Sequence, residues 1–117
     1  MRKRVIKEIK RPWGGFRQFT LNKLSTVKIL TVKKEKRFSL QFHKNREEFW
    51  RILSGRAIIT IGKKRVKAKK GDEFFIKRNQ NHRIESIGDD LEVLEIAYGK
   101  FDEKDIVRLE DDYGRIK

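Results

Sequence analysis

Alternation between apolar and polar side chains runs through the middle of the chain and constrains the fold more than any other feature. Residues 36–43 place Phe38, Leu40 and Phe42 on one face of an extended segment and polar side chains on the other. Further short runs follow, separated by Gly-, Asn- and Asp-containing turns. The pattern predicts strands over residues 27–32, 36–43, 49–53, 57–61, 72–76, 83–87 and 91–97, with one short helix over residues 103–107. Many short strands at this spacing predict an all-β sandwich or barrel.

The length of 117 residues leaves room for one domain, and the absence of cysteine excludes disulfides and thiolate metal sites. We expect a single domain over residues 1–117, with a core over about residues 25–100. Residues 1–24 are expected to form an N-terminal arm and residues 101–117 a C-terminal tail, both packed outside the core. No apolar run approaches the length of a signal peptide or a membrane span. The sequence therefore predicts a soluble, cytoplasmic protein without a membrane partner.

The charge is strongly basic and unevenly distributed. The net charge is +14, and residues 1–80 hold 25 basic and 6 acidic side chains, whereas residues 81–117 hold 6 basic and 11 acidic ones. Such a field attracts phosphates of any kind, from a sugar phosphate to RNA. Heat adaptation is the alternative explanation, because charge-dense surfaces are common in heat-adapted proteins. Charge alone names no partner.

Four side chains of the metal-ligand type occur at related positions. Gln41 and His43 are two residues apart on one predicted strand and therefore share a face. Glu48 opens the next strand, and His82, the second of only two histidines, stands at a later strand start. Two imidazoles, a carboxylate and an amide oxygen can hold a divalent ion and leave coordination positions open for a substrate.

These residues have the spacing of the two cupin motifs. Gln41-x-His43-x4-Glu48-x6-Gly55 resembles the first motif, with Gln41 in the first histidine position, and Gly71-x10-His82 resembles the second. More closely, the chain resembles the C-terminal isomerase domain of the bifunctional mannose-1-phosphate guanylyltransferase/mannose-6-phosphate isomerase family, also called type II phosphomannose isomerase. The resemblance runs from about residue 11 to residue 115, and it is carried by Arg11-Pro12-Trp13-Gly14, Val27-Lys28, Ser39-Leu40-Gln41-Phe42-His43, Glu48, Trp50, Ser54-Gly55 and Glu110-Asp111-Asp112-Tyr113-Gly114-Arg115. The exchange of Gln for His and the Asp-Asp-Tyr-Gly-Arg run are specific to this family rather than to cupins in general.

The resemblance implies a single-domain cupin barrel, also described as a double-stranded β-helix or jelly roll. It implies one divalent metal ion per chain, zinc first and manganese, cobalt or nickel as alternatives, held by Gln41, His43, Glu48 and His82. The implied activity is metal-dependent isomerisation of mannose 6-phosphate and fructose 6-phosphate, with a small-molecule sugar phosphate as partner.

The sequence departs from the family pattern at several positions. Lys77 and Asn79 replace a Pro and a Gly of the second motif, and Asn tolerates the left-handed turn that Gly would supply. Glu35 stands where a Gly is expected before the first motif, and the family's three histidines are reduced to His43-Lys44-Asn45. The guanylyltransferase domain is missing from the 117 residues, so we expect no nucleotidyl transfer from this chain.

Isomerisation needs a base for the proton on C2 and cations for the phosphate. Lys28 shares its parity with Leu30 and Val32, so we expect it to point into the barrel and to handle phosphate or proton. Arg37 is a second substrate-binding candidate, and Arg115 is a catalytic candidate because of the family resemblance. Glu85 is the candidate base.

Two readings from other classes remain. A stand-alone cupin can be a non-catalytic sugar- or metal-binding module, and a basic β-barrel can bind nucleic acid. The second is disfavoured because the sequence shows no aromatic stacking motif and no basic recognition helix. The face formed by Phe38, Leu40 and Phe42 beside Phe49 is apolar enough to predict a homodimer.

Overall fold

The computed structural model describes residues 6–116, and every helix or strand element within them is a β-strand. The strands are β1 (Lys7–Arg11), β2 (Gly14–Gln18), β3 (Ser25–Val32), β4 (Leu40–Phe42), β5 (Glu47–Ser54), β6 (Arg56–Ile61), β7 (Lys64–Lys69), β8 (Glu73–Ile76), β9 (His82–Ser86), β10 (Leu91–Tyr98) and β11 (Val107–Glu110). The all-β prediction is confirmed. Within the described span, no helix is long and apolar enough to cross a membrane.

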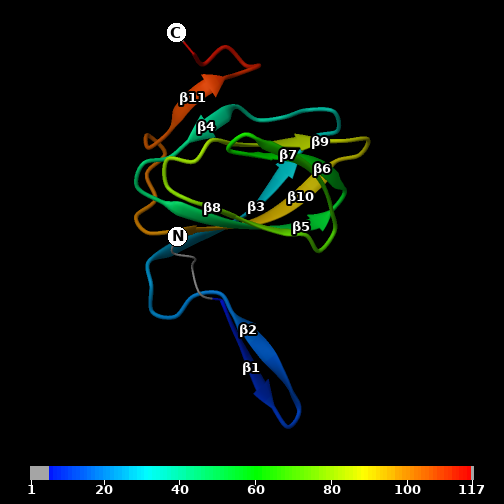
Figure 1. The fold of residues 1–117 in the computed structure, drawn as a ribbon, viewed down its shortest axis with the longest axis vertical. Coiled ribbons are helices and arrows are strands. Elements are labelled where there is room, and N and C mark those ends of the chain that lie inside the picture. Colours follow the sequence, from blue (N-terminus) through cyan, green and yellow to red (C-terminus); the bar gives the residue numbers. More distant parts are fainter. Residues whose placement is uncertain (1–5, 117) are drawn as a thin grey trace.

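Two antiparallel sheets face each other and form a barrel-like sandwich (Figure 1). One sheet has the strand order β3-β10-β5-β8, and the other has the order β11-β4-β9-β6-β7. The first sheet is almost continuously paired along β10, which matches β3 over eight residues and β5 over seven. The second sheet contains β9, which begins at His82, and β4, which ends one residue before His43.

The main core fills the space between the two sheets. Trp50, Ile52, Ile59, Ile84 and Leu91 are completely buried there, and Val93, Val32, Ala57, Ala68 and Ile76 join them. Because successive side chains of a strand point to opposite faces, the odd-numbered residues of β10 and the even-numbered residues of β5 face this interior. The same parity brings polar residues of these strands into the barrel.

A second, smaller core lies on the outer face of the four-stranded sheet. Phe49, Ile96 and Tyr98 are buried there under Phe19 and Phe75. The Tyr98 hydroxyl donates a hydrogen bond to the Phe19 carbonyl oxygen at 3.0 Å. The segment that follows the N-terminal hairpin is thereby fixed to the barrel wall.

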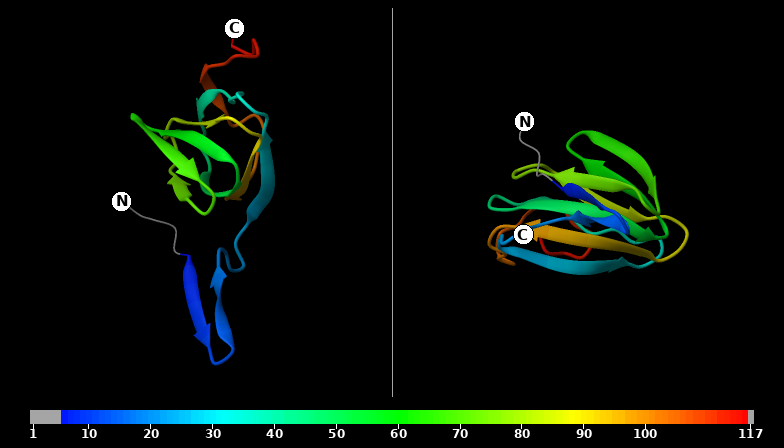
Figure 2. Two further views of the ribbon diagram at one scale, coloured as in Figure 1. Left: turned by 90° about the vertical axis from the view of Figure 1, so that its right-hand side faces the viewer. Right: turned by 90° about the horizontal axis from the view of Figure 1, so that it is seen from below.

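The hairpin of β1 and β2 extends away from the barrel at the end opposite the C-terminal segment (Figure 2). It accounts for the elongated outline of 54 × 32 × 23 Å. Arg17 holds its base to the barrel through Glu73, with Nη1 to Oε2 at 2.5 Å. The expected arm over residues 1–24 thus contains a strand pair that alternation alone did not predict, and its first five residues lie outside the described part of the chain, as does Lys117.

The predicted strand over residues 36–43 is regular only as β4, Leu40–Phe42. The segment before it crosses to β9, where the Phe38 amide donates to the Ile84 carbonyl oxygen at 3.3 Å and Arg37 forms an isolated bridge with Glu85. The Phe38 ring packs against Trp50 with ring centroids 6.4 Å apart. Phe38 packs against the main core and the 3 % exposed Phe49 lies in the second one, so the expectation that they share one exposed face with Leu40 and Phe42 is wrong, whereas the homodimer itself stays a prediction.

The helix expected over residues 103–107 is also wrong. Its central Asp105 carboxylate instead accepts hydrogen bonds from the backbone amides of Lys44 and Asn45, at 2.8 and 3.0 Å. The chain then enters β11, which pairs with β4 at the edge of the five-stranded sheet. The segment expected as a tail thus closes one side of the candidate site.

Left-handed turns occur where the motif comparison required them. A Cβ on Gly55, at φ +87°, would lie 2.6 Å from the Asp90 carbonyl oxygen, so the turn between β5 and β6 needs glycine. Asn79 has φ +62°, as expected for a residue standing in a glycine position, and its amide donates to the His43 carbonyl oxygen at 2.8 Å. Glu35, which replaces the other glycine, also has positive φ, +61°.

Candidate metal centre

Two strand-borne groups of ligand-type residues meet inside the barrel. His43 follows β4, Glu48 lies on β5 and His82 opens β9, so both sheets contribute. One ligand atom from each of the three residues lies within 4.8 Å of the others. The exposed fractions of the three residues are 3, 1 and 1 %, which places the cluster fully inside the protein. The structure therefore brings together the three strongest ligands expected from the sequence.

Both histidine rings are oriented from behind by backbone carbonyls. His43 Nδ1 lies 2.7 Å from the Asp105 carbonyl oxygen, and His82 Nδ1 lies 2.8 Å from that of Gln80. Since a carbonyl oxygen only accepts, each Nδ1 carries the proton and each neutral ring presents its Nε2 lone pair to the interior. His82 Nε2 is buried and has no hydrogen-bond partner among residues 6–116. An orphaned, oriented imidazole nitrogen of this kind fits a metal ligand.

The protonation states suit a divalent cation. Burial lowers the pKa of His82 to about 4 and also lowers the pKa of His43, so both rings are neutral at pH 7. Burial alone would raise the pKa of Glu48, but His82, His43 and Arg46 outweigh it and lower that pKa. The cluster thus offers two neutral imidazoles and one carboxylate, a donor set that zinc and similar transition metals accept.

The Glu48 carboxylate is held at both oxygens. Trp50 Nε1 donates to Oε1 at 3.1 Å, and Arg46 Nε donates to Oε2 at 3.0 Å. Arg46 also places Nη2 3.2 Å from His43 Nε2. The ligand lone pairs therefore already face a cation, and the carboxylate has the outer partners that orient metal ligands in proteins.

Gln41, the fourth ligand expected from the sequence, lies beside the cluster of three. It is directly opposite His82 in the register of β4 and β9, and its Nε2 is 3.4 Å from His43 Nε2. Its Oε1 accepts a hydrogen bond from Ser39 Oγ at 2.5 Å. The amide is therefore on the correct face, with its oxygen turned toward Ser39.

Two charged residues on the inner face of the four-stranded sheet adjoin the cluster. Glu95 is 7 % exposed and stands opposite Lys28 on β3 and Trp50 on β5. Burial, and then the neighbouring Glu48 carboxylate with which it shares a hydrogen bond, raise the pKa of Glu95 to about 8. Lys28 lies at the rim, with Nζ 3.7 Å from Glu103 Oε1 and 4.0 Å from the centre of the Phe101 ring.

Lys28 thus occupies the inward position expected for it, but the other catalytic and substrate candidates lie elsewhere. Glu85 is three residues after His82 on β9, and because side chains alternate along a strand, the two residues lie on opposite faces. The Glu85 carboxylate pairs with Arg65 at 3.1 Å. Arg37 pairs with Asp112 at 2.9 Å, and Arg115 pairs with Asp111 at 2.6 Å. Both aspartates belong to the C-terminal segment that follows β11. Nothing in this geometry gives these three residues access to the ligand cluster.

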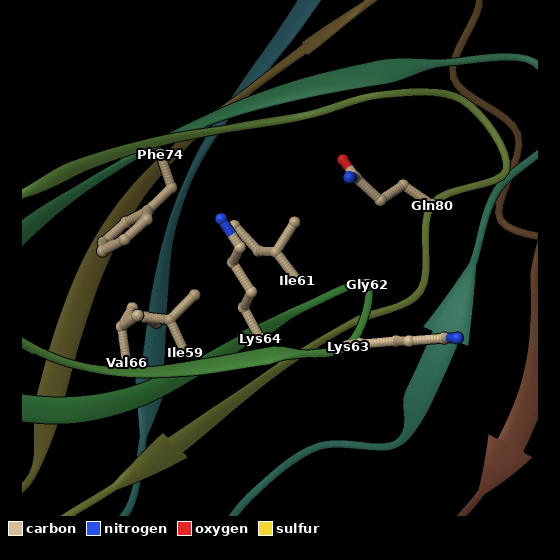
Figure 3. Close-up of a pocket in the computed structure, with 8 residues that line it drawn as sticks. All are labelled: Ile59, Ile61, Gly62, Lys63, Lys64, Val66, Phe74 and Gln80. Atoms are coloured by element: carbon tan, nitrogen blue, oxygen red, sulfur yellow. The ribbon is translucent and has the colours of Figure 1, made fainter.

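An open cavity of about 490 Å³ is lined by residues of β6, β7 and β8, where the edge strands β7 and β8 of the two sheets are not paired with each other. Figure 3 shows its apolar floor and the side chains of Lys64 and Gln80 extending toward it. Ile61, on this floor, is directly opposite His82 in the register of β6 and β9. None of His43, Glu48 and His82 lines the cavity, and the Ile61–His82 pair is the link between its floor and the strand that carries one ligand candidate.

Sequence reasoning missed Arg46, Trp50 and Glu95 as parts of the site. Glu95 had a detectable signal, because it shares the parity of Leu91, Val93 and Ala97, all of which are buried. A charged residue in an inward register is unusual and points to a site. Arg46 lies in a loop without periodicity, so no such signal identifies it.

Comparison with known proteins agrees with this arrangement. The family model described as "Mannose-6-phosphate isomerase C-terminal" matches residues 2–111. The xanthan biosynthesis protein XanB of Xanthomonas campestris is 35 % identical over 93 % of this chain and 24 % of its own length. The alginate biosynthesis protein AlgA of Pseudomonas aeruginosa is 37 % identical over 92 % of this chain and 23 % of its own length. A mannose-1-phosphate guanylyltransferase of Klebsiella pneumoniae is 38 % identical over 93 % and 24 %.

Solved structures agree on the fold. A double-stranded β-helix protein of Klebsiella pneumoniae has a TM-score of 0.66 at 18 % identity, covering 78 % of each chain. The nucleoside dehydratase Pac13 has a TM-score of 0.63 at 18 % identity, covering 80 % of this chain and 75 % of its own. The present chain spans about a quarter of the length of the curated relatives it matches. With a cupin fold and a family match across residues 2–111, the chain belongs to the mannose-6-phosphate isomerase C-terminal family.

Proposed function

We propose that the chain catalyses metal-dependent interconversion of mannose 6-phosphate and fructose 6-phosphate. The observation that carries the proposal is the buried His43–Glu48–His82 cluster, with oriented Nε2 lone pairs, in a chain of this family. Similarity to guanylyltransferases that contain such a domain supports a sugar-phosphate substrate. Nucleotidyl transfer is not proposed.

His43, Glu48 and His82 would hold one ion, with Gln41 as the fourth ligand. When bound, a divalent ion supplies Lewis-acid stabilisation of the charge that develops on two adjacent sugar oxygens. The residues fit zinc first, with manganese, cobalt and nickel as alternatives. Trp50 and Arg46 keep the Glu48 carboxylate fixed through the reaction.

We assign proton transfer to Glu95 and Lys28, which stand opposite each other on the inner face of the barrel. In the direction from aldose to ketose, the proton leaves C2, the C–H electron pair forms the C1–C2 double bond of an enediol, and the carbonyl oxygen takes a proton. A proton is then delivered to C1 as the O2–H proton leaves and the ketone forms. Glu95, whose pKa is about 8, can accept the C2 proton in its ionised form and return it to C1 once protonated, while the Lys28 ammonium group can donate to the carbonyl oxygen.

The test is a coupled isomerase assay on purified protein loaded with zinc, cobalt, manganese or nickel. Turnover of mannose 6-phosphate that disappears on chelation and returns with metal is expected. If no metal supports turnover of either sugar phosphate, the enzyme proposal fails and a non-catalytic sugar- or metal-binding module takes its place. A third hypothesis, a nucleic-acid-binding barrel, is tested by gel mobility: a shift of a random oligonucleotide on addition of the protein would support it.

We also propose a homodimer, through a different surface from the one the sequence suggested. Val27 and Ile29 are 59 and 60 % exposed on the outer side of edge strand β3, and Trp13 is 73 % exposed at the hairpin tip. An isolated two-stranded hairpin is at best marginally stable, so a partner surface would stabilise it. Light scattering at tens of micromolar should give twice the mass of 14.1 kDa for the chain and the monomer mass for Ile29→Lys. A monomer in both cases would contradict the dimer.

A further inference from the structure

A row of five side chains crosses the inner face of the five-stranded sheet. In the strand register, Arg108 of β11 is opposite Gln41 of β4, and Gln41 is opposite His82 of β9. His82 is opposite Ile61 of β6, which in turn is opposite Lys64 of β7. Directly opposed residues of antiparallel strands share a face. Two metal-ligand positions therefore lie in one line with a cation at each end.

Among residues 6–116, Arg108 differs from the other cations near the cluster because no carboxylate forms a salt bridge with it. Its Nε is buried without a hydrogen-bond partner, and no ion pair engages it within residues 6–116. By contrast, Arg46 is bonded to Glu48, and Lys28 is paired with Glu103. A buried guanidinium N–H left unpaired is costly, so such a group is suited to donate a hydrogen bond to an anionic ligand.

We propose that Arg108 binds the phosphate of the substrate, an inference that rests on the proposed function. Neighbouring strands lie about 4.8 Å apart, which puts the backbone of Arg108 roughly 10 Å from that of His82. A hexose 6-phosphate whose C1 and C2 oxygens lie at the metal centre carries its phosphate at the far end of a six-carbon chain. Arg108 lies on the same face as His82 and has a long side chain, so its guanidinium can reach a phosphate held at that distance from the metal-ligand cluster.

Arg108 is favoured over Lys64 at the other end of the row. Lys64 is exposed to solvent at the open cavity, where water satisfies its ammonium group. The guanidinium of Arg108 is half-buried and can form two parallel hydrogen bonds to a phosphate. Lys64 is therefore the matched control, because it has the same parity and lies equally far from His82 in strands.

The experiment measures binding rather than turnover. Sorbitol 6-phosphate has no carbonyl group and cannot isomerise, so calorimetry on zinc-loaded protein at fixed salt compares it with sorbitol. The chain is expected to bind the phosphate at least tenfold more tightly than sorbitol. Arg108→Gln should abolish this difference, Arg108→Lys should retain part of it, and Lys64→Gln should leave it within about twofold. Lys67→Gln, on the outer face of β7, controls for loss of one positive charge.

Circular dichroism and zinc content of each variant establish that the barrel and the metal centre are intact. If Arg108→Gln binds sorbitol 6-phosphate as the parent chain does, the assignment is overturned, as it is if Lys64→Gln alone loses binding. If Arg108→Gln does not fold, an Arg108→Lys variant that binds as tightly as the parent overturns it. Absence of isomerase turnover together with Arg108-dependent phosphate binding would refute the proposed function and leave the phosphate site standing.

Discussion

The indole nitrogen of Trp50 donates a hydrogen bond to Glu48 Oε1 at 3.1 Å, inside a core where both side chains are almost completely buried. Trp50 is thus both a core residue and the partner that fixes one oxygen of a candidate metal ligand. Trp50→Phe keeps most of the ring and removes only this donor. We expect metal affinity, measured by competition with a chromogenic chelator, to fall about tenfold, as is usual when an outer partner of a ligand is lost. Trp13→Phe, at a 73 % exposed position, should leave the affinity unchanged.

The ligand assignment itself predicts a stoichiometric result. His43→Ala and His82→Ala should each reduce bound zinc, measured by mass spectrometry of acid-released metal, from one ion per chain to a small fraction of it. Each change removes one of the three donors that converge within 4.8 Å. Asn81→Ala, next to His82 in sequence but not among the ligands, is the control. A double His43→Ala, His82→Ala variant that still bound one ion per chain would show that the assignment is incorrect.

The fold could be predicted because its signals are local. Alternation predicts the strands that surround the main core, and the motif spacing predicts that His43, Glu48 and His82 come together, as they do in the structure. Where a second interaction competed with the local pattern, the prediction failed. Alternation groups Phe38 with Leu40 and Phe42 on the face expected to form a dimer, but the Phe38 backbone bonds to β9 and its ring packs against Trp50 in the core.

The charged residues of the site were harder to predict, because their roles depend on which strands become neighbours. Glu85 alternates with the buried Ile84 and faces outward beside Arg65, whereas Glu95 shares the parity of the buried Val93 and faces the ligand cluster. Parity separates the two carboxylates, but it does not show that Glu48 is the neighbour of Glu95. Arg108 gained its significance only from the pairing of β11 with β4, which joins residues 67 positions apart in the chain. Such a contact leaves no periodic signal in one sequence.

Glu95 predicts the pH dependence of stability in metal-free protein. Its pKa is raised to about 8 in the folded state, by burial and by Glu48, so the folded state retains a proton that the unfolded state releases. Stability therefore falls as pH rises toward 8, by at most about 1.4 kcal/mol per pH unit. His82, with its pKa lowered to about 4, acts in the opposite direction, since stability gained from its neutral form is lost as pH falls below about 6.5.

The two effects separate between about pH 6.5 and 8, because the effect of Glu95 on stability extends over this range and that of His82 lies below it. Urea unfolding of chelator-treated protein should show stability decreasing across that window. Glu95→Gln, a neutral mimic of the protonated carboxyl, should flatten the decrease and be the more stable chain at pH 8. A parallel decrease in both proteins would mean that another group is responsible.

If Arg108 binds the phosphate, the role that remains for Lys28 is proton transfer together with Glu95. Lys28 stands opposite Glu95 and is paired at the rim with Glu103. If the pair transfers the proton, Lys28→Met removes an interaction made in the transition state, so kcat should fall about 100-fold while KM stays within about twofold. Glu103→Gln, which removes the partner and keeps the ammonium group, should retain most of the activity. An increase in KM at unchanged kcat would instead place the phosphate at Lys28, and in that case KM should also rise with salt, since charge attraction at a rim is screened over about 8 Å.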